Sequence, residues 1–187
     1  MSPERISLLA VLLAAAAATP AAAAPLGLGR PASINEIAGW DIDVRADGRG
    51  LPPGRGGVRE GRDLYAEKCA ACHGAHGEGK PMDALVGGAG TLASATPVRT
   101  VGSYWPYATT LFDFIRRAMP FNAPQSLTPN QVYAVSAYVL YLNGILPQDA
   151  VLDAKTLPKV RMPNRNGFTA PDPRPDVKPQ PAGTPGG

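Results

Sequence analysis

The residues best suited to chemistry lie in one five-residue stretch, Cys69-Ala-Ala-Cys72-His73. These are the only two cysteines in the 187-residue sequence, and His76 is the only other histidine. Cys-x-x-Cys-His is the spacing of a c-type haem attachment site. Two sulfurs one helical turn apart can form thioethers with vinyl groups on one porphyrin edge, and the following imidazole can then bind the iron. The stretch therefore predicts one covalently bound haem c, held by Cys69, Cys72 and His73.

The N-terminus has the pattern of a secretory signal peptide. Arg5 precedes an apolar run over residues 6–18, and an alanine-rich stretch then supplies an A-x-A site. We expect a signal peptide over residues 1–23, with cleavage after Ala23. The apolar run is shorter than the roughly 20 residues that usually span a bilayer, so an uncleaved anchor is the less favoured alternative. We therefore expect a periplasmic protein with no membrane span after cleavage, which suits haem attachment outside the cytoplasm.

Export also strengthens a second interpretation of the two cysteines. Extracytoplasmic cysteines are usually disulfide-bonded, and Cys69 and Cys72 could form a redox-active pair without haem. A thioredoxin-like motif should lie in a βαβ pattern. No alternating strands flank residues 69–72, and a redox pair has no need of His73, so haem attachment is favoured.

Composition and patterning predict one domain with two flanking arms. The formal net charge of +3 at pH 7 is thinly spread, without the long basic run of a nucleic-acid-binding protein or an acidic tail. We expect an irregular N-terminal arm over residues 24–57, a domain over 58–146 and a proline-rich C-terminal extension over 147–187. Residues 151–168 carry enough apolar side chains to lie along the domain or a partner. In the N-terminal arm, four apolar residues predict a short extended segment: Ile37, Trp40, Ile42 and Val44.

Three helices are expected to position the haem motif. The first, over residues 59–70, has helical apolar spacing and carries the motif at its C-terminal end. The second has Pro106 in its first turn, and Pro120 limits its continuation. The third begins at Thr128, which with Gln131 forms a capping-box pattern, and should pack across the first.

The second helix predicts the other axial ligand. It would present Met119 at its C-terminal end, directly before Pro120, and a methionine thioether commonly binds the iron of c-type cytochromes. Three alternatives stay open. Met119 could be a core gap-filler, or Met162 could be the ligand instead. Met82 is disfavoured, because it lies too close to His73 to reach the other face of the porphyrin easily. Without a methionine ligand, the iron would have an open distal site, as in a sensor or peroxidase.

Neighbouring residues have expected roles around the ring. A carbonyl between residues 80 and 83 should accept a hydrogen bond from His73, because a ligating histidine normally donates its second ring N–H. Arg116 or Arg117 is suited to pairing with a haem propionate, and His76 should face solvent. Three aromatic residues could line the haem edge: Tyr104, Trp105 and Tyr107.

The order of these features resembles a class I cytochrome c over residues 58–146. The resemblance implies an all-α fold in which Cys69 and Cys72 hold the haem, His73 is the proximal ligand and Met119 the distal ligand. The family often has Pro-x-Leu-x-Gly after the motif, and the carbonyl of that proline accepts from the ligand histidine. Here the corresponding residues read Asp83-Ala-Leu-Val-Gly, which leaves the hydrogen-bond partner of His73 open.

Three stretches carry a narrower resemblance, and they lie at residues 40–44, 101–121 and 162–168. They read WDIDV, VGSYWPYATTLFDFIRRAMPF and MPNRNGF. These stretches resemble the SoxD-like and cytochrome c-551 subunits of bacterial sulfane and sulfite dehydrogenases. The resemblance implies a partner subunit that carries a molybdenum cofactor and oxidises sulfite or a bound sulfane sulfur. Because the chain has no second Cys-x-x-Cys-His, it is similar to the single-haem members.

The expected function is therefore electron transfer rather than catalysis. We expect a periplasmic monohaem cytochrome that takes single electrons from a molybdenum-containing sulfite or sulfane dehydrogenase. A downstream cytochrome or oxidase would receive them. The alternative is a general diffusible carrier to a terminal oxidase.

Overall fold

The computed structural model describes residues 28–168, which divide into a short unit ending at Asp41 and a larger unit beginning at Ile42. The predicted signal peptide over residues 1–23 lies outside the described residues, as does the proline-rich end from residue 169 onward. Between residues 28 and 168, no helix is both long and apolar enough to cross a membrane.

The short unit contains a helix, α2 (Ile34–Trp40), where the sequence predicted an extended segment. The prediction is wrong for Ile37 and Trp40, because a capping box starts a helix at this point. The Ser33 hydroxyl accepts from the Glu36 N–H at 3.3 Å, and a Glu36 carboxylate oxygen accepts from the Ser33 N–H at 2.8 Å. Arg30 also donates to Glu36 at 2.8 Å, which adds an ion pair at the start of the helix. Trp40 is exposed and makes no buried contact within this unit.

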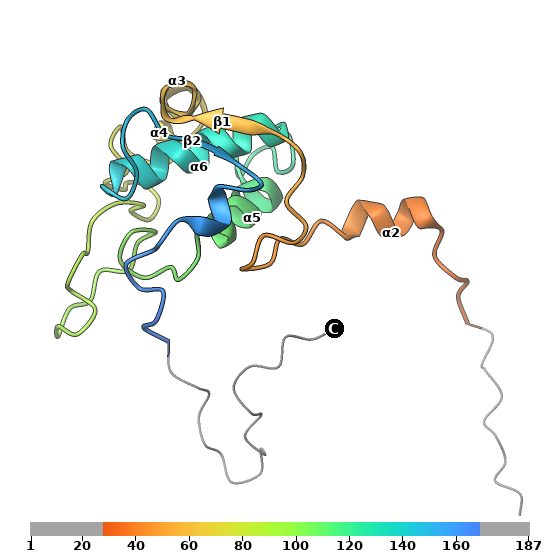
Figure 1. Ribbon diagram of the computed structural model, residues 1–187, viewed down its shortest axis with the longest axis horizontal. Helices are drawn as coiled ribbons and strands as arrows, with labels where there is room; N and C mark the ends of the chain where they lie inside the picture. The colour runs from red at the N-terminus through yellow and green to blue at the C-terminus, as the bar shows by residue number, and fades with distance from the viewer. Residues whose placement is uncertain (1–27, 169–187) are drawn as a thin grey trace, which may run out of the picture. The chain divides into compact units, whose positions relative to one another are not determined.

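The larger unit is organised around one helix, α6 (Pro129–Leu142), and confirms the predicted all-α class with one small sheet added. Figure 1 shows α6 running through the centre of this unit, with the other elements around it. Helices α3 and α5 and both strands contact α6. The remaining elements are β1 (Arg55–Gly57), α3 (Val58–Lys68), α4 (Ala70–His73), α5 (Ala108–Ala118), β2 (Val151–Asp153) and η1 (Leu157–Lys159).

Helix α6 begins where its capping pattern predicted. The Thr128 hydroxyl accepts from the Gln131 N–H at 3.4 Å, and the Gln131 side chain accepts from the Thr128 N–H at 2.9 Å. Every residue from Val132 to Leu140 is buried, so the helix is covered on all sides rather than along one stripe. Such all-round burial is typical of a core helix.

Helix α3 crosses α6 at Gly61, where the two backbones approach closely. A Cβ at Gly61 would overlap the carbonyl of Ala134 and would lie 2.9 Å from Cβ of Tyr138. Glycine is therefore required by space rather than by an unusual backbone angle. The crossing is what fixes the haem motif, at the end of α3, relative to the core.

Replacing Gly61 with alanine is expected to lower the free energy of unfolding by about 1–3 kcal/mol, because the added methyl group must push two packed helices apart. Urea unfolding followed by circular dichroism measures this change. Arg62→Ala on the exposed face of the same helix is the control, with an expected change within about 0.5 kcal/mol. Equal stabilities for the two variants would contradict the close crossing.

The compact unit is wider than the predicted domain over residues 58–146. Strand β1 pairs antiparallel with β2, with Gly56 opposite Leu152. Beyond β2, Leu157 and Met162 are 0% and 3% exposed and belong to the core. The segment over residues 151–168 therefore packs on the domain, which is one of the two positions that the sequence allowed.

Candidate haem site

Both cysteines lie at the junction of α3 and α4. Cys69 is the C-cap of α3, and its carbonyl accepts from the N–H groups of Cys72 at 3.1 Å and His73 at 3.0 Å. This turn holds the two sulfurs and the imidazole in one short helical element. Cys69 is half-buried and Cys72 is exposed, and they are not joined by a disulfide.

The environment of Cys69 disfavours a redox-active pair. Burial raises the pKa of the Cys69 thiol to about 11. Redox-active cysteines have lowered pKa values, because the thiolate is the reactive species. The half-buried sulfur therefore suits a structural attachment point better than a thiol-exchange centre.

The imidazole of His73 is oriented by a backbone carbonyl within the predicted window of residues 80–83. Its Nδ1–H donates to the carbonyl oxygen of Asp83 at 2.8 Å. Asp83 therefore supplies the same kind of acceptor as the family's proline at that position. The contact fixes the tautomer and leaves Nε2 as the nitrogen available to a metal.

Because the acceptor is a backbone atom, replacing Asp83 with alanine is expected to leave the visible absorption spectrum and the reduction potential of the haem unchanged. Spectroelectrochemistry of the variant tests this expectation. A large shift in either property would mean that the Asp83 carboxylate, rather than its carbonyl, acts on the site. Asp63→Ala, on the exposed face of α3, removes an equal charge elsewhere and is the control.

The loop after the motif is closed onto the helices by its own hydrogen bonds. The Gly77 carbonyl accepts from the N–H groups of Leu85 and Val86 at 2.8 and 3.1 Å. The hydroxyl of buried Tyr65 donates to the Gly74 carbonyl at 3.0 Å. Gly77 has φ +78°, and a Cβ there would overlap the Val86 side chain, so this position requires glycine. The loop thus brings Asp83 back to the imidazole.

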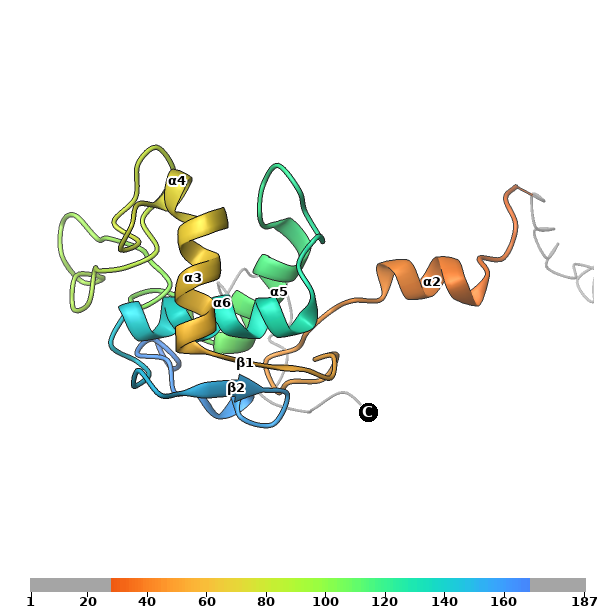
Figure 2. The same cartoon turned by 90° about the horizontal axis from the view of Figure 1, so that it is seen from above.

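The three methionines among residues 28–168 lie in different environments. Met119 directly follows α5, with its N–H bonded to the Ile115 carbonyl at 3.1 Å, and it is half-buried against the core. Met82 is 49% exposed, whereas Met162 is almost completely buried. Figure 2 shows α4 and the connection leaving α5 on the same side of α6. Met119 is therefore less exposed than Met82 and less enclosed than Met162.

The donor set and its surroundings fit haem c. Two free thiols, an oriented imidazole and a half-buried thioether are the groups that a covalently bound, six-coordinate haem uses. Several apolar side chains pack against the core on one side while keeping part of their surface exposed. Such surfaces suit a flat apolar ring. They include Cys69, Ala70, Leu85, Trp105, Met119 and Leu127.

Comparison with known proteins identifies the family. The family profile described as Cytochrome c matches residues 58–143. A chain from the crystal structure of the sulfane dehydrogenase SoxCD from Paracoccus pantotrophus is 41% identical, with a TM-score of 0.75. The match covers 87% of this chain and 84% of that one. This chain belongs to the cytochrome c family.

A curated relative lies further away. This cytochrome c is 33% identical over 89 residues to a thiosulfate dehydrogenase of Psychrobacter arcticus. That match covers 44% of this chain and 25% of the relative, so the chain spans about a quarter of that protein's length. The family confirms the class I fold and covalently bound haem c, for which Cys69 and Cys72 provide the attachment motif. The cytochrome c domain is accordingly an electron carrier.

The two arginines of α5 bind the protein itself. Arg117 donates to Asp113 at 3.0 Å and also pairs with Asp43, and Arg116 donates to the Ile42 carbonyl at 3.3 Å. These contacts hold residues 42–44 against α5. Pairing of either arginine with a haem propionate stays a prediction. The four-residue spacing of Asp113 and Arg117, typical of a helical ion pair, could have revealed this role.

The aromatic residues before α5 contact other side chains of the protein, and their expected place at the haem edge stays a prediction. The ring of Trp105 packs edge-on against Phe114, with 5.7 Å between centroids. Tyr104 contacts Phe168 in the same way at 5.2 Å, and Arg165 lies over Tyr107. Two of the three rings thus face the C-terminal extension. His76 is exposed, as predicted.

Helix α5 begins slightly later than expected. Tyr107 is its N-cap and Ala108 its first residue, so Pro106 precedes the helix instead of occupying its first turn. The buried residues of α5 include Ala108, Leu111, Phe112 and Ile115, which face the core.

Proposed function

We propose that this cytochrome c is the electron-accepting subunit of a periplasmic, molybdenum-containing sulfite or sulfane dehydrogenase, and that it delivers electrons to a downstream cytochrome or oxidase. The observation that carries this proposal is the 41% identity to a chain of the SoxCD sulfane dehydrogenase structure over 87% of the sequence. That match extends well beyond the 58–143 segment shared with cytochromes c in general. The signal-peptide pattern of residues 1–23 supports export.

We further propose that His73 and Met119 are the two axial ligands. Haem c supplies a one-electron iron couple when bound. The protein itself positions the two ligand side chains. The Asp83 carbonyl orients the His73 imidazole, and Met119 lies half-buried in apolar surroundings at the end of α5. Methionine ligation and an apolar environment both favour a raised reduction potential, as an acceptor requires.

The partner can be tested by mixing oxidised cytochrome anaerobically with the purified molybdenum dehydrogenase and either sulfite or thiosulfate. We expect reduction of the haem, followed at its visible absorption bands, only when dehydrogenase and substrate are both present. Ascorbate should reduce the cytochrome without the dehydrogenase, which shows that the haem is competent. Reduction by ascorbate but by neither sulfur substrate would contradict the proposed partner, while the role as an electron carrier would stand.

The substrate is decided by the same experiment. The identity to a sulfane dehydrogenase chain favours a reduced sulfur compound, and the match to a thiosulfate dehydrogenase supports including thiosulfate. An open distal site is tested separately, since carbon monoxide should then bind readily to the reduced protein. Ready binding would count against Met119 as a ligand.

A further inference from the structure

The C-terminal segment over residues 155–168, here termed the strap, is anchored to the domain by three buried side chains. Leu157, Val160 and Met162 point into the core, with exposures of 0%, 9% and 3%. Most residues between and beyond them are exposed, although Pro158 and Asn164 are partly buried, and η1 packs against α5. The strap therefore has a fixed inner face and a separate outer face.

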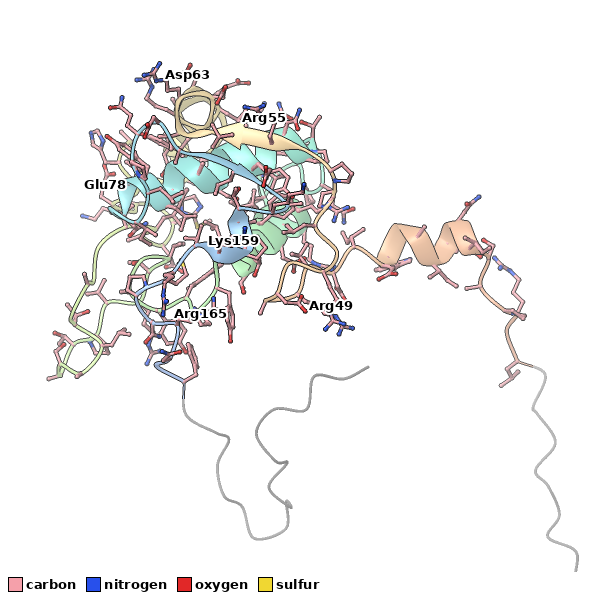
Figure 3. The ribbon with its side chains drawn as sticks, viewed as in Figure 1. Arg49, Arg55, Asp63, Glu78, Lys159 and Arg165 are labelled. Carbon is pink, nitrogen blue, oxygen red and sulfur yellow. The ribbon has the colours of Figure 1, made fainter. Side chains whose placement is uncertain are left out.

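The outer face carries charge of one sign. Lys155, Lys159, Arg161 and Arg165 are exposed, and the strap contains no acidic residue. Among the ion pairs of the described residues, none involves these four side chains. Figure 3 shows Lys159 and Arg165 on the side of α6 away from Asp63. The strap thus carries four basic side chains without an ion pair, of which Lys155 lies near Asp153, on a chain whose net charge is only +3.

The end of the strap is held in place by the aromatic stretch before α5. The Asn164 amide donates to the Tyr104 carbonyl at 2.7 Å, and the Arg165 guanidinium lies 5.0 Å from the centre of the Tyr107 ring. Tyr104 and Phe168 remain 36% and 52% exposed although their rings are in contact. Arginine and aromatic residues are enriched in protein–protein interfaces and their energetic hot spots.

We propose that the strap docks this cytochrome onto an acidic surface of the electron-donating dehydrogenase subunit. This inference rests on the proposed function, and it concerns residues beyond the 58–143 segment that matches the cytochrome c family. A protein surface fits better than a membrane, because the apolar residues of the strap point inward and are not available for insertion. Four charges interleaved with apolar anchors are also unlike the continuous basic runs that bind nucleic acid.

The expected contribution is mainly to association rate. Charges at the edge of an interface steer diffusional encounter, and their effect falls as salt shortens the screening length. That length decreases from roughly 30 Å at about 0.01 M salt to roughly 3 Å at about 1 M. A strap that steers the dehydrogenase should therefore lose its influence at high salt.

The test compares two double charge reversals. Lys159→Glu with Arg161→Glu alters the strap, whereas Arg55→Glu with Arg59→Glu makes the same change in net charge on exposed residues of β1 and α3. Association with the immobilised, purified dehydrogenase subunit is measured by surface plasmon resonance at about 0.01 M and 1 M salt. We expect the strap variant to associate about tenfold more slowly at low salt and to match wild type at high salt. The control variant should change much less.

Four outcomes would overturn the inference. In the first, the strap variant associates with the dehydrogenase subunit as fast as wild type. In the second, both variants lose association rate equally. In the third, the wild-type protein does not bind the subunit. The fourth is salt-dependent binding to phosphatidylglycerol vesicles that the strap reversal abolishes while dehydrogenase binding persists. Lys159→Gln with Arg161→Gln removes charge without reversing it and should give a smaller loss. Reduction of the haem at saturating dehydrogenase and substrate tests the proposed function separately, since slow association is then overcome.

Discussion

Replacing Met119 with alanine is expected to abolish the methionine–iron charge-transfer band and to lower the reduction potential. The choice of axial ligands changes haem reduction potentials over a range of roughly 0.8 V. A methionine ligand raises the potential, so loss of the thioether should lower it. Spectroelectrochemistry of the oxidised and reduced variant measures both effects. Carbon monoxide should also bind the reduced variant readily, because the distal position is opened.

Met162→Ala is the matched control for this experiment. Met162 is a core residue at 3% exposure, so its truncation should cost about 2–5 kcal/mol of folding stability while the charge-transfer band persists. Loss of the band in Met162→Ala, with its retention in Met119→Ala, would move the ligand to the strap. The two variants therefore separate ligation from packing.

The double replacement Cys69→Ser and Cys72→Ser is expected to eliminate covalent haem entirely. Serine keeps the size of each side chain and removes only the sulfur that forms the thioether. The wild-type protein should retain its haem through denaturing electrophoresis and acid–acetone extraction, and the variant should not. A pyridine haemochrome spectrum shows in addition whether both thioethers are present.

Single replacements sharpen this prediction. Either cysteine alone should leave at most one thioether and shift the haemochrome band, and His76→Ala should change nothing because that histidine is exposed outside the motif. Covalent haem in the double variant would contradict attachment at these two residues. A wild-type protein without haem would contradict the cofactor.

Much of the haem-bearing framework could be predicted from the sequence, because it depends on local patterns. The Thr128–Gln131 capping box and the Cys-x-x-Cys-His turn each involve residues close together in the chain, and the structure contains both. The acceptor for His73 could be narrowed to residues 80–83 for the same reason, since the loop is too short to offer many carbonyls. Selecting Asp83 required the folded loop.

Features that depend on distant residues could not be predicted in this way. Strand β1 is only three residues long and pairs with residues almost a hundred positions later, so no local alternation indicated it. The pairing of Arg117 with Asp43 likewise joins segments that periodicity cannot connect. The unexpected helix α2 is different, because the Ser33–Glu36 capping signal was local and was missed.

The sequence by itself determined the cofactor, because attachment of haem c depends on two sulfurs and an imidazole at one fixed spacing. It also determined where α6 begins, and it predicted the end of α3 at residue 70, two residues beyond the observed end at Lys68. Met119 lies directly before Pro120 in the sequence. Only the tertiary structure decided which carbonyl orients His73 and which methionine is buried as core. Those choices depend on how α3, α5 and the strap pack around α6, where burial and close contact, rather than spacing along the chain, set each residue's role.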